Sequence, residues 1–85
     1  MIDFYCKEYS DKKWNNYMSY IKSSHIKIKG IPQDVADSLY HILGNGMKEW
    51  INRPISALDG KTAVQLLESS DGTKALKAFI MRMPC

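Results

Sequence analysis

Proline and glycine residues divide the second half of this chain into short segments. Pro54 prevents continuation of a helix that we predict over residues 47–52, because proline disfavours the helical conformation in the residue before it. Residues 56–60 form a turn that ends on Gly60, and Thr62 is placed to cap the helix that follows. This spacing excludes long helices from the region and favours a bundle of short ones.

Apolar residues recur at helical spacing in three further stretches. They predict helices over residues 11–24, over residues 31–43, and from Ser70 or Asp71 to the residue before Pro84. The side chains on these faces read as core. They are Trp14, Tyr17, Met18 and Ile21 in the first helix, Val35, Leu39, Ile42 and Leu43 in the second, and Leu76, Phe79, Ile80 and Met83 in the last.

Residues 1–30 show a different pattern, in which apolar and other residues alternate over two short stretches. Alternation is typical of strands, so a strand-helix-strand extension is predicted here. We expect one mainly α domain over residues 1–85, formed by a small bundle of four to five helices. Two short N-terminal strands are an optional addition to this bundle. The helical bundle would occupy residues 31–85. The alternating residues are Ile2, Phe4 and Cys6, and later Ile26 and Ile28.

The short length limits the hydrophobic core. A chain of 85 residues buries only roughly 60 to 65% of the surface that it exposes when unfolded. Cys6 and Cys85 are the only cysteines and show no disulfide framework, so we expect a reduced, cytoplasmic protein. No signal-like N-terminus or membrane-spanning apolar run is present, and no membrane partner is expected. A small core without disulfides indicates a homodimer or a hetero-oligomer.

No catalytic or metal-binding constellation is recognisable. His25 and His41 are not at helical spacing with each other, and neither has a cysteine or second histidine nearby to complete a zinc site. The chain contains no nucleophile elbow, phosphate loop or dinucleotide fingerprint. We therefore expect no enzyme, no metal and no cofactor.

The net charge of +3 is spread along the chain, with +1 in residues 1–43 and +2 in residues 44–85. The densest basic stretch, with Lys22, Lys27 and Lys29, is no richer than many solvated surfaces. We do not expect nucleic acid binding by this chain on its own. A small nucleic-acid-binding protein that uses this stretch remains an alternative.

From Val35 to about Met83 the order of signals resembles a known family, the toxin-binding domain of Xre/MbcA/ParS-type antitoxins. That family typically has Trp-Leu-x-x-Pro, then Ala-Leu-Gly-Gly-Lys-Thr-Pro, then Leu-Leu and a glycine that opens the last helix. This chain has Trp-Ile-Asn-Arg-Pro at residues 50–54 and Ala-Leu-Asp-Gly-Lys-Thr at residues 57–62. The residues that carry the resemblance in structural roles are Trp50, Pro54, Leu58, Gly60, Thr62, Leu67 and Gly72.

The resemblance implies a non-catalytic protein that neutralises a cognate toxin by occlusion, commonly a RES-type toxin that degrades NAD. It also implies dimers or larger toxin-antitoxin complexes. Ala63 stands where the family usually has proline, which is a mild departure. Family members usually carry a DNA-binding helix-turn-helix before this domain, and the first 30 residues here do not resemble one.

The last helix and the apolar tail are the predicted partner surface. Arg82 is the only charged residue among residues 80–85 and would block contacts to an anionic cofactor in the toxin. The alternative for these residues is packing of the last helix against the core. Another alternative is a phage or mobile-element inhibitor of a different host protein, with its specificity in residues 1–30. The predicted partner-binding residues are Lys61, Phe79, Ile80, Arg82, Met83 and Cys85.

Overall fold

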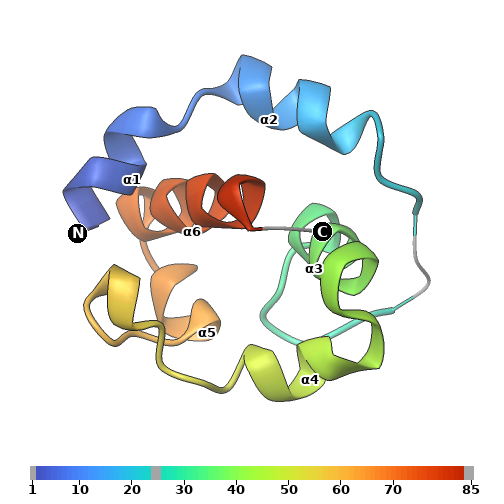
Figure 1. Cartoon of the computed structure of the whole chain (residues 1–85). Helices are drawn as coiled ribbons and strands as arrows, with labels where there is room; N and C mark the ends of the chain where they lie inside the picture. Colours follow the sequence, from blue (N-terminus) through green and yellow to red (C-terminus); the bar gives the residue numbers. More distant parts are fainter. Residues whose placement is uncertain (1, 24–25, 84–85) are drawn as a thin grey trace.

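The computed structural model describes residues 2–23 and 26–83, and these ranges are mainly helical (Figure 1). The mainly α class is therefore confirmed. No helix in the described ranges is both long and apolar enough to cross a bilayer. The α-helices are α1 (Ile2–Glu8), α2 (Asp11–Met18), α3 (Gln33–Leu43), α4 (Met47–Trp50), α5 (Ala63–Leu66) and α6 (Ser70–Arg82), with 3-10 turns η1 (Gly44–Gly46) and η2 (Ser56–Leu58).

Helix α6 is central to the packing, because it contacts α1, α2, α3 and α5. Its predicted apolar face is confirmed in part: Leu76 and Ile80 are fully buried, whereas Phe79 and Met83 are partly buried against the core. Helices α1 and α2 form an arm along one edge of the molecule in Figure 1. The fully buried side chains that the other elements contribute to the same core include Val35, Leu39, Met47, Leu58 and Leu66.

The two short N-terminal strands do not form in the described part of the chain. Residues Ile2–Glu8 are helical, and residues 26–28 have no regular structure. Ile2 and Cys6 satisfy helical spacing as well as alternation, and Tyr5 and Tyr9 complete one helical face. Ile2, Tyr5 and Tyr9 pack against the core, so burial on α6 selects the helix. A short strand here would have left its backbone groups without a ladder partner.

The ends of several helices differ from the prediction, and α4 ends at Trp50 instead of Asn52. Helix α2 ends at Met18 instead of Ser24, which lies outside the described residues. The Ser19 hydroxyl donates a hydrogen bond of 2.6 Å to the Asn16 carbonyl, and such a bond competes with continued helix. Helix α3 begins directly after Pro32, which is its N-cap residue.

The turn and the cap that precede α5 are confirmed. Asp59 and Gly60 both have positive φ, at 59° and 72°, as the predicted reversal requires. The Thr62 hydroxyl accepts a hydrogen bond from the Gln65 backbone N–H at 3.3 Å, and the Gln65 side chain accepts one from the Thr62 N–H at 2.9 Å. This reciprocal pair is a capping box, and it explains why α5 starts at this point.

Helix α6 is capped by Ser69, one residue before the predicted Ser70 or Asp71. The Ser69 hydroxyl accepts a hydrogen bond of 2.9 Å from the Gly72 backbone N–H. Gly72 is buried at the corner between α5 and α6, where a side chain would collide with the backbone carbonyl of Leu66. The glycine is therefore needed for close backbone approach.

Candidate partner-binding site

Helix α1 lies against the end of α6 that carries the predicted partner-binding residues. The Tyr5 and Phe79 rings meet edge to face, with centroids 5.5 Å apart. Glu8 Oε1 lies 2.8 Å from Arg82 Nη1, so an ion pair joins the two helices. The end of α6 is consequently held by α1, which the sequence analysis had not connected with it.

A row of ring contacts crosses this region from α1 through α6 to α4. Phe4 meets Tyr5 at 5.2 Å, Tyr5 meets Phe79, and Phe79 stacks on Trp50 at 6.5 Å with an interplanar angle of 22°. Aromatic pairs of this kind add to the stabilisation that burial alone provides. The row connects Trp50, the first residue of the sequence motif, with the N-terminal arm.

Arg82 has both a fixed orientation and an exposed side. Its guanidinium lies over the Phe4 ring at 5.4 Å and near the Tyr5 ring at 6.0 Å, in addition to the ion pair with Glu8. The side chains of Arg82 and Glu8 are nevertheless 51% and 41% exposed, and Phe4 is 45% exposed. An arginine, a carboxylate and an aromatic ring are thus presented together on the surface.

The other predicted partner-binding residues have different surroundings. Ile80 is fully buried in the core, so it stabilises the fold and is not on the surface. Met83 is partly buried against the core, and Cys85 lies outside the described residues. Lys61 is exposed on a turn, where its backbone bridges to Ile55, and it belongs to none of the ring contacts or ion pairs recorded for the end of α6.

The residues of the sequence motif are mostly internal to the domain. Leu58 is fully buried, and Trp50 and Leu67 are partly buried against the core. Pro54 is exposed and follows the end of α4. With Gly60, Thr62 and Gly72 in the turn, cap and corner described above, the motif carries the scaffold.

A second set of contacts anchors the N-terminal arm. Lys77 Nζ lies 3.5 Å from Asp34 Oδ2 and 5.1 Å from the centre of the Trp14 ring. The Trp14 Nε1–H donates to the same Asp34 oxygen at 3.0 Å. The Lys77 side chain is only 17% exposed, so this network ties α2, α3 and α6 together in a partly buried setting.

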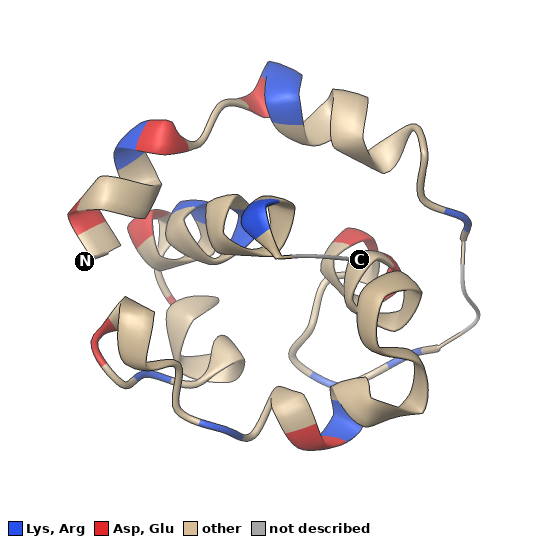
Figure 2. Ribbon diagram, in the orientation of Figure 1, with Lys and Arg blue, Asp and Glu red and all other residues tan. Residues whose placement is uncertain are grey.

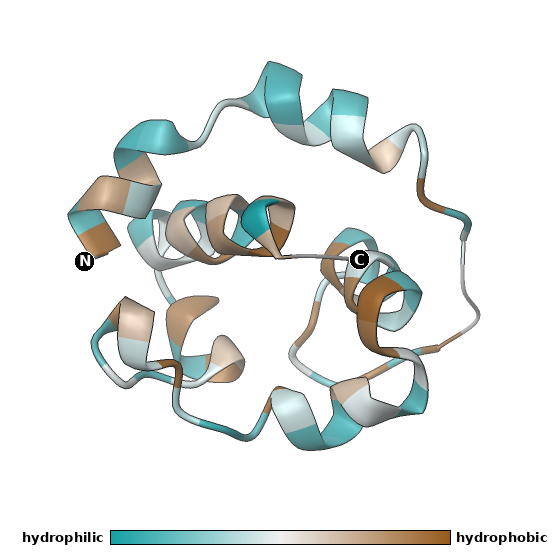
Figure 3. Cartoon of the chain, in the orientation of Figure 1, coloured by the Kyte–Doolittle hydropathy of each residue, from teal (hydrophilic) through white to brown (hydrophobic). Residues whose placement is uncertain are grey.

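Helix α2 depends on that anchor because it is mostly hydrophilic (Figure 3). Trp14 is its only buried residue. Residues of both charge signs lie on each of the helices α1, α2 and α6 (Figure 2), so none of these three helices carries charge of one sign only.

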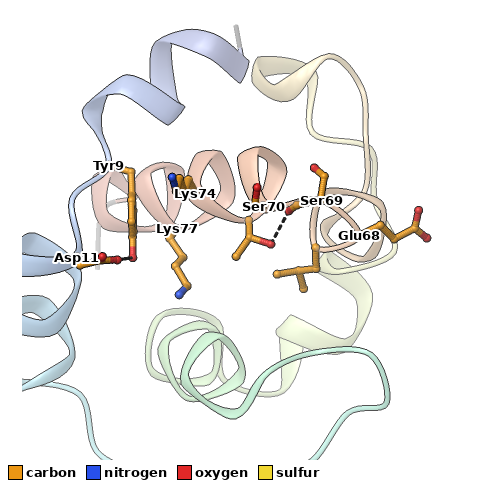
Figure 4. A pocket seen from close by; sticks show the side chains of 9 residues that line it. Tyr9, Asp11, Glu68, Ser69, Ser70, Lys74 and Lys77 are labelled. Carbon is orange, nitrogen blue, oxygen red and sulfur yellow. Dashed lines mark hydrogen bonds between the residues drawn. The ribbon is translucent and has the colours of Figure 1, made fainter.

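A shallow, open depression of about 460 Å³ separates the arm from the start of α6 (Figure 4). Several of the polar groups that line it already have partners. The Tyr9 hydroxyl donates to Asp11 Oδ1 at 2.7 Å, Ser69 caps α6, and Lys77 pairs with Asp34. We interpret the depression as a seam between two packed elements.

Tyr9, which lines this seam, is expected to make the stability of the fold depend on pH. Burial, followed by the hydrogen bond to Asp11, raises the pKa of Tyr9 to about 12 from its ordinary value of 10.0. The fold therefore favours the neutral phenol, and the stability that this contributes is complete below pH 10 and is lost as pH rises toward 12. An ultraviolet titration of tyrosinate should show a late transition that Tyr9→Phe removes.

The control for this titration is Tyr20→Phe, at a side chain that is 77% exposed. That variant should keep the late transition. A titration in which Tyr9→Phe and Tyr20→Phe leave the same curve would contradict the assignment.

Comparison with known protein families gives a match over the second half of the chain. Residues 38–83 match the family model described as the antitoxin Xre/MbcA/ParS C-terminal toxin-binding domain. The matched range begins within α3 and includes α4, α5 and α6, whereas α1 and α2 lie outside it. The searches of curated proteins and of solved structures gave no match.

Proposed function

Because the chain belongs to the family of antitoxin Xre/MbcA/ParS C-terminal toxin-binding domains, we propose that it neutralises a cognate toxin by covering the toxin's active site. The family match carries this proposal. It covers more than half of the chain, and it includes all of α6 with Phe79 and Arg82. The antitoxin role and a protein toxin as partner follow from the family, and the mode of inhibition is the part that needs testing.

The proposed contact surface is the exposed side of the end of α6. Arg82 supplies a positive charge that is about half exposed, and Phe79 and Met83 supply partly exposed apolar surface beside it. Arginine is favoured at protein interfaces because its planar guanidinium forms paired hydrogen bonds with carboxylates. Ile80 is left out of the surface because it is fully buried.

The toxin that we propose is of the RES type, which degrades NAD. A site that binds NAD is entered by a ligand with a negatively charged pyrophosphate, and Arg82 would cover that entrance by pairing with an acidic side chain at its rim. Arg82 is the only charged residue near the end of α6 that faces solvent from residue 80 onward among the described residues. In this proposal, recognition of the toxin therefore depends on the Arg82 side chain.

The proposal is tested by co-expressing this chain with the product of the adjacent reading frame. The wild-type chain should restore growth and maintain cellular NAD, whereas Arg82→Glu should weaken binding by about tenfold or more, which corresponds to about 1.4 kcal/mol. Lys27→Glu, an equal charge change at an exposed residue outside the matched range, should bind as the wild type does.

Each result addresses a different part of the proposal. Growth arrest that the wild-type chain does not relieve would remove the antitoxin role for this pair. Arrest without loss of NAD would exclude the RES type. Equal binding by Arg82→Glu and the wild type would place the contact surface away from the end of α6.

A further inference from the structure

We infer that α1 is part of the surface that contacts the toxin and remains docked on α6 in the complex. This inference rests on the proposed function, because it extends the same surface from Arg82 to the helix beside it. Helix α1 lies outside the range that matches the family, so it would be a contribution of this chain's own N-terminal arm.

Phe4 is the residue of α1 that most indicates a contact role. It is a large apolar side chain with 45% of its surface exposed, and it does not belong to the core cluster or to the residues packed against that cluster. Its ring is held in place by the edge of Tyr5 and by the Arg82 guanidinium. An aromatic side chain with a fixed orientation and an exposed face loses little conformational freedom when it binds.

Glu8 likewise holds the neighbouring Arg82 side chain in a fixed orientation while leaving part of it exposed. One guanidinium nitrogen of Arg82 is paired with Glu8 Oε1 at 2.8 Å, and about half of the arginine side chain faces solvent. A guanidinium carries five donors, so the exposed side of Arg82 can also meet a carboxylate of a partner. Aromatic and arginine side chains dominate the energetics of protein interfaces.

Helix α1 is held on α6 along much of its length. Near the start of α6, Cys6 Sγ lies 3.9 Å from Asp71 Oδ1, and near its end Glu8 pairs with Arg82. Helix α2, which follows α1 in the same arm, is anchored by the buried Trp14. These contacts support a helix that stays in place over one that must leave to expose a site.

The surface fits a protein partner of definite chemistry. Phe4 would enter an apolar hollow on the toxin, and the free edge of the Arg82 guanidinium would meet an acidic side chain next to it. We commit to the toxin as the occupant because Arg82 lies at the end of the helix that the toxin-binding family model covers, and Phe4 is in contact with it.

The first test measures affinity for the purified product of the adjacent reading frame. Phe4→Ala should weaken binding by about tenfold or more, with an unchanged circular dichroism spectrum and only a small fall in the unfolding midpoint, because Phe4 lies outside the core cluster. Tyr20→Ala, at a more exposed aromatic residue, should bind as the wild type does. Unchanged affinity of Phe4→Ala would overturn the inference.

The second test locks α1 in place. Asp71→Cys, combined with Cys85→Ser to avoid mispairing, places a second thiol opposite Cys6, whose Sγ lies 3.9 Å from Asp71 Oδ1. Mass spectrometry identifies the fraction of the protein in which oxidation has joined the two thiols. The oxidised and reduced forms of this one variant are each other's control. If α1 remains docked on α6 in the complex, both forms should bind the same product equally.

A loss of affinity only on oxidation would show that α1 has to move, and would overturn the inference while leaving the antitoxin role intact. Failure of the wild type and of both forms to bind would instead remove the proposed function, and the inference with it. Equal binding by the two forms, together with weak binding by Phe4→Ala, is the result that we expect.

Discussion

Replacement of Gly72 by alanine is expected to lower the free energy of unfolding by about 3 kcal/mol. The added methyl group would meet the backbone carbonyl of Leu66 and the Ser69 hydroxyl, which also caps α6. Backbone atoms cannot rotate away as a side chain can, so the corner between α5 and α6 must open. A domain of this size has a total stability of roughly 4 to 13 kcal/mol, and the loss would be a large part of it. Urea unfolding followed by circular dichroism measures it.

Gly46→Ala is the matched control. Gly46 has helical backbone angles, with φ at −66°, and open space where the methyl group would lie. The variant should keep or slightly raise the stability, by up to about 1 kcal/mol, because alanine restricts the unfolded chain. If Gly72→Ala unfolded at the same urea concentration as the wild type, the close approach at the corner would be disproved.

Replacement of Trp14 by alanine is expected to cost about 3 to 5 kcal/mol and to release the N-terminal arm. Trp14 is 3% exposed, and it is the only buried residue of α2. The change removes its stacking on Tyr17 at 5.6 Å, its hydrogen bond to Asp34, and the ring that lies next to Lys77. Removal of one partner also leaves the partly buried charges less well satisfied.

Amide hydrogen exchange distinguishes release of the arm from global unfolding. At low urea the amides of α1 and α2 should lose protection, while those of α3 and α6 keep it. Asn15→Ala, at an exposed position of the same helix, should have an effect within about 0.5 kcal/mol. Protection of α1 that persists in Trp14→Ala would mean that α1 is held by α6 alone.

Local signals of the sequence were sufficient for much of the fold. The apolar spacing of Leu76, Phe79 and Ile80 predicted α6, and Thr62 predicted the start of α5. These features involve residues within one or two turns of each other, so the sequence contains both partners side by side. The position of the α6 cap was wrong by one residue, because Ser69, Ser70 and Asp71 are all suitable cap residues in isolation.

The N-terminal arm shows where local reasoning was insufficient. Ile2 and Cys6 are compatible with both a strand and a helix, because an interval of four residues is a multiple of the strand period and also about one helical turn. The choice depends on the surface that receives the apolar face. Helix α6 is that surface, and it comes from the opposite end of the chain.

The candidate site divides in the same way. Phe79 and Arg82 were identified from the sequence, and the family resemblance was confirmed by the match over residues 38–83. The burial of Ile80 and the contacts that Phe4 and Glu8 make with Arg82 depend on how α1 and α6 pack. The roles of Phe4, Phe79 and Arg82 at a partner surface remain predictions.

The sequence by itself determined which segments between Val35 and Met83 are helices and turns, together with the family to which they belong, because hydrogen bonds and apolar spacing over a few residues specify them. Only the tertiary structure decided that the first residues form a helix and that Arg82 is oriented by it. The physical reason is that burial of an apolar face and pairing of charges require a partner surface, and for α1 that surface is supplied by residues at the far end of the chain.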